Sequence, residues 1–532
     1  MAYTSTLLGL LSFITILFYY TRLFMNRRPP NFPPCPPTLP LVGNLHQLSL
    51  EKGHLKLAEL CQKYSSHGLM GLQLGPSTHA VVINSWKVAR DLLDQRGAIY
   101  SSRPPFLATP MVMPPPGNYH LALLEYGPKW RKERKTIMEF LRESEIEKRC
   151  WIDEAESSQL MYELLVEPGR FLEHVYRCHS AILFASVYGM RAKEFVDNSI
   201  AKRFSDLEED WAAITAPGGI PPLDIFPFLK YVPDFLTRWR GWKQRVRFVG
   251  QRQHAFYHEL AAGVRERMTQ GRSRECFMLD LLRTQDKNEY SDIDLEYIGG
   301  VLMEGGSDTA ANTFGTFLLA MAAYPSILKR AQAEVDEYYG NDQMPTRTNN
   351  AELPYLRACL LEILRWRPSL AGGIPRATTQ DDVYEGFFIP ANTMVMLNIR
   401  GINHDSEEFD NPDEFDPTRF LPHPTGSNTS PGQSIDSHLR RTIWTFGGGR
   451  RVCPGQSMAQ RSLLSTMAKV VWCFDIEAVS PDEIDTSPNG FHAGMTEGPK
   501  PFQARFRVRG EDRKRIIERE WEKADAYLAD FE

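Results

Sequence analysis

The sequence predicts a mainly α-helical fold with small β-sheets, behind a single N-terminal transmembrane helix. Three observations carry this prediction. Residues 150–274 are mostly helical in pattern, and the longest helix candidate extends from Ser291 to about Tyr324. Strand-like stretches are short, as in the hairpin predicted over residues 70–84. The first 21 residues are almost wholly apolar and uncharged.

Length and composition limit the function classes. The 532-residue chain is 42% apolar, enough for a sizeable core, and its formal net charge is −5. A charge this close to neutral gives no reason to expect nucleic acid as a partner. The 8 cysteines are scattered without framework spacing. We therefore expect reduced thiols in a protein that faces the cytosol.

The N-terminal segment has the properties of a membrane anchor. Ala2 to Thr21 carries no charge, and about 20 apolar residues of helix span a bilayer core. Arg22, Arg27 and Arg28 follow, so the positive-inside rule places the rest of the chain in the cytosol. A cleaved signal peptide is the alternative. No basic residue precedes the apolar run, however, and no clear cleavage site follows it.

The remaining elements follow from periodicity and from turn residues. Proline-rich sequence after the anchor predicts a stiff, extended linker. The predicted elements are a helix over Ser85–Asp94, an irregular loop over Ser102–Leu124, helices beginning at Tyr126 and spanning Leu353–Trp366 and Gln456–Phe474, strands over Tyr384–Phe388, Thr393–Leu397 and Pro501–Val508, and a charged helix over Glu511–Glu532.

The long helix from Ser291 begins with a capping box. Ser291 and Asp294 have the required spacing, and Pro325 ends the helix. Gly299, Gly300, Gly305 and Gly306 interrupt it, each at a cost of about 1 kcal/mol relative to alanine. Close approach of a cofactor is one reason for a helix to carry that cost.

The loop from Phe446 to Gly455 contains one cysteine, Cys453, within a glycine-rich bend before a helix. A thiolate is a strong, soft ligand for iron. The helix N-terminus offers unpaired N–H groups and a positive dipole end, which should lower the pKa of the thiol. Arg451 lies where a guanidinium could pair with a cofactor carboxylate. A buried free cysteine in a turn is the alternative. Zinc is disfavoured, because the sequence has no C-x-x-C pair and no H-E-x-x-H motif.

The spacing F-x-x-G-x-R-x-C-x-G resembles the cysteine-ligand loop of the cytochrome P-450 family. Gly305 to Thr309 resembles the oxygen-activating A-G-x-D-T motif of that family, with glycine in place of the first alanine. Glu362 and Arg365 fit the E-x-x-R pair of the family. Pro417 to Phe420 resembles the segment whose arginine, here Arg419, joins that pair. The resemblance extends over nearly the whole chain and implies a triangular helical prism that encloses a haem.

The resemblance also implies roles for individual residues. The cofactor would be haem b (iron protoporphyrin IX), with Cys453 as the iron ligand. Phe446 belongs to the cofactor-binding loop. Asp308 would relay protons and Thr309 would supply a hydroxyl for oxygen activation. The residues that match haem-propionate ligands are Trp130, Arg134, Arg376 and Arg451.

The implied activity is a membrane-bound monooxygenase that uses O₂ to hydroxylate, epoxidise or oxidatively cyclise an apolar small molecule. Electrons would come from NADPH through NADPH–cytochrome P-450 reductase, because the chain has no G-x-G-x-x-G dinucleotide site and no flavin domain. The sequence is similar to filamentous-fungal members that tailor secondary metabolites, in the group around O-methylsterigmatocystin oxidoreductase.

The expected organisation has four parts. Residues 1–25 form the anchor in membrane lipid, residues 26–45 the linker, residues 46–510 the haem-thiolate catalytic domain and residues 511–532 a charged helical tail. We expect a single-pass protein of the endoplasmic reticulum membrane with a cytosolic catalytic domain. Two alternatives remain open: a reductase-independent haem-thiolate isomerase or dehydratase, which NADPH and O₂ dependence would distinguish, and a non-catalytic haem-binding protein.

Overall fold

The computed structural model describes residue 9 and residues 11–16, 28–346, 353–422 and 443–532. Helices form most of this part of the chain, and its strands assemble into three small sheets. The predicted mainly helical fold with small β-sheets is therefore confirmed.

The helices are long in the body of the molecule and short near the sheets. The α-helices are α2 (Gly53–Tyr64), α3 (Trp86–Ala89), α4 (Thr109–Val112), α5 (Pro128–Phe140), α6 (Glu143–Val166), α7 (Phe171–Tyr188), α8 (Ile200–Thr215), α9 (Trp242–Thr269), α10 (Phe277–Arg283), α11 (Asp292–Ala323), α12 (Pro325–Tyr339), α13 (Pro354–Trp366), α14 (Ile399–Asn403), α15 (Gln456–Cys473) and α16 (Glu511–Leu528). The strands are β1 (Leu69–Leu74), β2 (Thr78–Ile83), β3 (Arg376–Ala377), β4 (Asp382–Tyr384), β5 (Phe387–Ile389), β6 (Met394–Leu397), β7 (Phe474–Ala478) and β8 (Ala504–Val508). Three short helical turns also matter below: η3 (Arg90–Gln95), η7 (Pro417–Phe420) and η8 (Gly449–Arg451).

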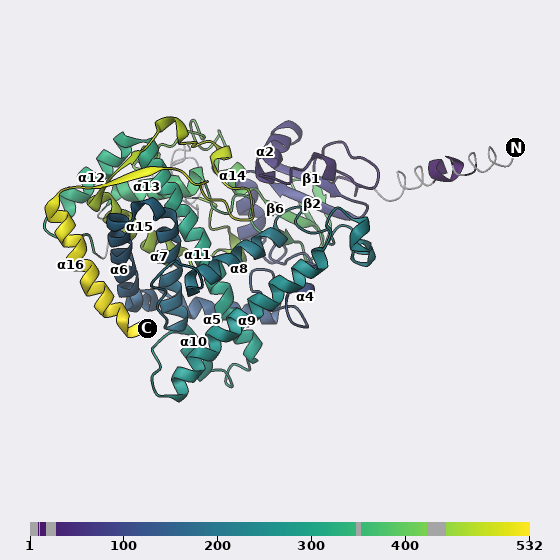
Figure 1. The fold of residues 1–532 in the computed structure, drawn as a ribbon. Helices are drawn as coiled ribbons and strands as arrows, with labels where there is room; N and C mark the ends of the chain where they lie inside the picture. The colour runs from purple at the N-terminus through teal and green to yellow at the C-terminus, as the bar shows by residue number, and fades with distance from the viewer. Residues whose placement is uncertain (1–8, 10, 17–27, 347–352, 423–442) are drawn as a thin grey trace.

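The largest sheet has the strand order β1-β2-β6-β3. β1 and β2 form the predicted antiparallel hairpin, with Leu69 opposite Ile83. β6 pairs parallel to β2 and antiparallel to β3. In that register Arg376 lies opposite Val395, so the sheet fixes the backbone position from which the Arg376 side chain extends. Figure 1 shows β1, β2 and β6 together with α2 at one end of the molecule, while α16 runs along the outer edge of the helical body.

Helix α11 crosses the body and packs against α7, α9, α13 and α15. Its N-terminus has the predicted capping box: the Ser291 side chain accepts from the backbone of Asp294, and the Asp294 side chain accepts from the backbone of Ser291. Most side chains before and after residues 301–310 are buried, but within that segment only Met303 and Ser307 are fully buried. The middle of the central helix therefore has accessible surface.

Three of the five glycines in α11 are explained by close helix packing. A Cβ at Gly299 would lie 2.6 Å from the Tyr188 hydroxyl, one at Gly300 2.4 Å from the Tyr257 ring, and one at Gly306 2.7 Å from Leu183. Cofactor approach is therefore not needed to explain these three positions. Gly305 differs, because a Cβ there would meet nothing within 4 Å.

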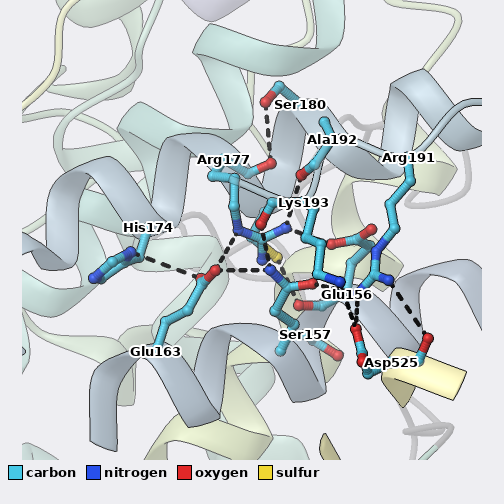
Figure 2. A network of polar contacts seen from close by, with 12 residues as sticks. Glu156, Ser157, Glu163, His174, Arg177, Ser180, Arg191, Ala192, Lys193 and Asp525 are labelled. Atoms are coloured by element: carbon cyan, nitrogen blue, oxygen red, sulfur yellow. Dashed lines mark hydrogen bonds and ion pairs between the residues drawn. The ribbon is translucent and has the colours of Figure 1, made fainter. Parts of the chain in front are cut away.

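The C-terminal helix α16 packs on α6, with Ile516, Ile517, Ala524 and Leu528 buried. The side chain of Arg191, which is 1% exposed, forms ion pairs with the C-terminal end of the tail, at 2.5 Å to Asp525 and 2.9 Å to Glu532. Figure 2 shows this arginine reaching Asp525 beside a second buried network, in which Arg177 contacts Glu156 and Glu163. Ion pairs and apolar packing thus both attach the tail.

Two predicted elements differ in the structure. The strand predicted over Tyr384–Phe388 is broken, because Glu385 and Gly386 both have positive φ, at 48° and 85°, and form the turn between β4 and β5. The helix predicted over Ser85–Asp94 is present, but it changes from α3 to the π-helical turn η3 after Ala89.

Most of the predicted membrane anchor lies outside the described residues, of which only Gly9 and residues 11–16 fall in it, in helical conformation. Among the helices of the described chain, none alone is both long and apolar enough to cross a membrane. The pair α11 and α12 meets that criterion only when taken together, with a bend of 108° between them. The anchor stays a prediction.

Candidate functional site

Cys453 lies at the end of a tight loop that α15 follows. Its backbone N–H donates to Phe446 O at 2.9 Å, and Gly447 N–H donates to Trp444 O at 2.7 Å. These two bonds close the loop and place Cys453 three residues before Gln456, the first residue of α15.

The positions of this loop require glycine for different structural reasons. Gly447 and Gly449 have φ of +68° and +59°, which disfavours any side chain. A Cβ at Gly449 would lie 2.0 Å from Leu93 O, and one at Gly448 2.3 Å from the Trp444 ring. Close contacts with Trp444 and with the backbone of Leu93 thus explain why positions 448 and 449 are glycine. At Gly447 the nearest atom belongs to Arg376, at 3.7 Å, so that position leaves room beside the loop.

The pKa of Cys453 is shifted upward, which differs from the prediction. Desolvation is the largest cause, whereas the N–H of Gly455 and the charge of Arg134 act in the predicted, lowering direction. The helix terminus and the arginine favour the thiolate, but burial outweighs them. A metal ion bound to the sulfur would stabilise the thiolate.

Four arginines gather between this loop, β3, α5 and the loop after Tyr100. Arg451 donates to Ser101 O at 2.8 Å and to Leu124 O at 2.6 Å. Its guanidinium also lies 4.4 Å from the centre of the Trp130 ring. The other three donate to backbone carbonyls as well: Arg134 to Val452, Arg376 to Gly448, and Arg103 to Ile374 and Pro375.

The charges in this cluster repel one another. Burial together with Arg376 and Arg134 lowers the pKa of Arg451 to about 9. Burial together with Arg376 and Arg451 lowers the pKa of Arg103 well below its usual value. Carbonyl oxygens carry no net charge, and within the described part of the chain Arg103, Arg134 and Arg451 form no ion pair. The cluster therefore fits a bound group with carboxylates, as a haem has in its two propionates.

On α11, Asp308 and Thr309 point to different partners. The Thr309 hydroxyl donates to Gly305 O at 2.9 Å, on the side of the helix where Gly305 leaves open space. Asp308 accepts from the Thr496 hydroxyl at 2.5 Å, and burial raises the pKa of its carboxyl. The loop around Thr496 thus contacts α11 at Asp308.

Under the cysteine loop, the predicted Glu362–Arg365–Arg419 triad is present. Glu362 and Arg365 are 0% exposed and bind through two bonds of 2.7 and 2.8 Å, and Arg419 lies 3.2 Å from the same carboxylate. Burial of this kind requires pairing, because an unpaired charge there would be costly. Arg419 comes from η7, so the triad ties that turn to α13.

The sequence model of the Cytochrome P450 family matches residues 33–506. The chain belongs to this family. It is 35% identical to a cytochrome P450 monooxygenase of Arthrobotrys oligospora, over 98% of this chain and 97% of that one. It is 32% identical to the cytochrome P450 monooxygenase atE of Aspergillus terreus, over 96% and 93% of the two chains. It is also 32% identical to the cytochrome P450 monooxygenase patI of Penicillium expansum, over 100% and 99%.

Family membership identifies the protein as a monooxygenase with a haem cofactor, O₂, a substrate and a redox partner. The structure brings together Cys453, Arg134, Arg376 and Arg451, all of which the sequence indicated. It adds Arg103, which the sequence analysis missed. The signal was present, since Arg103 and His120 are the only basic side chains of the loop from Ser102 to Leu124.

Proposed function

We propose that this cytochrome P450 binds haem b through Cys453 and holds the propionates with Arg103, Arg134, Arg376 and Arg451. The cluster of buried, mutually repelling arginines beside the cysteine loop carries the proposal, because two carboxylates would relieve that repulsion. Trp130 packs against Arg451 and fixes its guanidinium. Phe446 closes the loop from which the thiolate is presented.

When bound, the thiolate-ligated haem supplies the reductive activation of O₂. The chain supplies protons and exclusion of water. The hydrogen bond from the Thr309 hydroxyl to Gly305 O holds this hydroxyl at the open side of α11. Asp308, whose carboxyl pKa is raised by burial, accepts from the Thr496 hydroxyl and is the group that relays protons.

The reaction is the insertion of one oxygen atom into an apolar small molecule by hydroxylation or epoxidation, or a following oxidative step such as ring closure. Electrons come from NADPH through NADPH–cytochrome P450 reductase. The fungal relatives support a place in secondary-metabolite biosynthesis. Residues 1–25 anchor the enzyme in the endoplasmic reticulum membrane, with the catalytic domain in the cytosol.

The absorption spectrum of the reduced protein with carbon monoxide tests the ligand. We expect a strongly red-shifted Soret band in the wild type, and its loss in Cys453→Ser. The matched control is Cys150→Ser, a half-buried thiol on α6, which should keep the band. A red-shifted band in Cys453→Ser, or a wild-type spectrum typical of histidine ligation, would contradict the assignment.

A further inference from the structure

Glu304 on α11 is the acceptor for three side chains from two other parts of the chain. His120 Nε2 donates to one carboxylate oxygen at 2.7 Å. Gln253 Nε2 donates to the other at 2.6 Å, and the Tyr257 hydroxyl donates to that same oxygen. His120 belongs to the loop after Ser102, and Gln253 and Tyr257 belong to α9. Hydrogen bonds to this one carboxylate thus connect the loop and α9 to the central helix α11.

This cluster lies beside the reacting end of the site. Glu304 precedes Gly305, where α11 leaves open space, and belongs to the accessible segment of that helix. Thr309 is five residues further along, which is about 7.5 Å of helix axis. Along α11, Gly305 thus lies between Glu304 with its partners and Thr309, whose hydroxyl donates to Gly305 O.

Two atoms of the cluster are buried and lack hydrogen-bond partners within the described chain. They are His120 Nδ1 and Gln253 Oε1, in residues that are 7% and 0% exposed. The nearby Tyr297 hydroxyl also lacks one there, and both burial and the Glu304 charge raise its pKa. Leaving a buried polar atom without a partner costs about 1–3 kcal/mol. Several such atoms around one carboxylate indicate a site for a polar group of a ligand.

The hydrogen-bond pattern determines which polar group fits. An ionised carboxylate only accepts, so His120 Nε2 must carry a proton, and Nδ1 is an acceptor when the ring is neutral. For the same reason the Gln253 amide presents its NH₂ to Glu304 and leaves Oε1 as an acceptor. Both free atoms thus accept, and they match a donor such as a hydroxyl. The His120 ring is stacked on Trp211, at 5.9 Å between centroids and 15°, which fixes its orientation.

We propose that His120 and Gln253, held by Glu304, form a polar subsite that binds a hydroxyl group of the substrate. The substrate class is then a small molecule that carries a hydroxyl group, such as a phenol or an alcohol, on the otherwise apolar compound expected from the sequence. The inference rests on the proposed function, because the subsite orients the substrate relative to the haem.

Ligands that coordinate the haem iron test the subsite without a known substrate. Phenylimidazole and biphenylimidazole, each with and without a hydroxyl on the terminal ring, bind iron through the imidazole nitrogen and shift the Soret band. Titration of the holoenzyme gives a Kd for each. We expect the hydroxylated member of at least one pair to bind about tenfold more tightly in the wild type.

Variants separate recognition from packing. His120→Phe keeps a ring against Trp211, and Gln253→Leu keeps the volume; either change should reduce the hydroxyl preference to less than about threefold. Tyr257→Phe is the control, because it removes a donor to Glu304 but leaves both free acceptors, and it should keep the preference. Equal affinities within both pairs in the wild type, or an undiminished preference in both variants, would overturn the inference. A holoenzyme whose Soret band none of the four ligands shifts would instead overturn the proposed haem site.

Discussion

Glu133 lies on the buried face of α5, one residue before Arg134, and its side chain is 1% exposed. Desolvation raises the pKa of its carboxyl to about 8, although Lys129 and Lys132 act in the opposite direction. The carboxyl is therefore mostly protonated at neutral pH in the folded protein. In the unfolded chain it titrates near its ordinary value of about 4.3.

This difference makes stability depend on pH. The folded state binds a proton that the unfolded state has released, so the stabilisation is complete below about pH 4.3 and is lost as pH rises toward about 8. The slope is about 1.4 kcal/mol per pH unit within that window. Glu133→Gln removes the proton linkage, so its stability relative to wild type should rise from pH 6 to pH 8. Urea unfolding of both proteins at the two pH values measures this, and a difference that does not change with pH would contradict it.

At the same scale, the sequence predicted residues that belong to a recognisable local pattern. Cys453, Arg451 and the Glu362–Arg365 pair each lie within a few residues of the rest of their motif. Arg103, His120 and Glu304 were missed, because their partners are far away in the chain. His120 and Glu304, for example, are 184 positions apart. A charged residue within the apolar middle of a helix was the available signal for Glu304.

Among the elements, α16 is attached to the body by a buried cation. Arg191 is 1% exposed, and its carboxylate partners Asp525 and Glu532 both come from the C-terminal end. Removing the partners would leave a buried charge uncompensated, which typically costs 3–5 kcal/mol.

We therefore expect truncation after Arg509 to lower the thermal unfolding midpoint by several degrees while the carbon monoxide spectrum of the remaining folded protein is unchanged. Arg515→Asp is the control within α16, since this side chain is 72% exposed and should have little effect on stability. A truncated protein with the wild-type midpoint would show that the buried ion pairs contribute nothing.

Element boundaries were predictable where a residue type enforces them. Ser291, Asp294 and Pro325 determine the ends of α11 through side-chain and ring chemistry. The predicted strand over Tyr384–Phe388 was wrong, because an apolar run hid the turn that Glu385 and Gly386 make. Glutamate with positive φ is uncommon, so composition gave little warning there.

For the molecule as a whole, α5 has one face toward the buried arginine cluster and an opposite, basic face that is exposed to solvent. Trp130 and Arg134 face inward to the arginine cluster, whereas Arg131, Lys132 and Lys135 are exposed on its outer side. A helix is about 10–12 Å across with its side chains, so the basic face lies within that distance of the proposed propionate site. An acidic electron donor docked on α5 would therefore be close to the haem.

This arrangement predicts salt-sensitive electron transfer. Exposed charges steer an oppositely charged partner and raise association rates by 10- to 1,000-fold, and salt screens them over about 10 Å at 0.1 M. Replacing Arg131 and Lys135 together by glutamate should slow reduction by the reductase by at least about tenfold at low salt. The difference should shrink as salt is added, as stopped-flow reduction under carbon monoxide would show. Arg515→Glu, a charge reversal of the same sign on α16, is the control and should leave the rate unchanged. Equal slowing by the control would mean that net charge, and not the face of α5, governs docking.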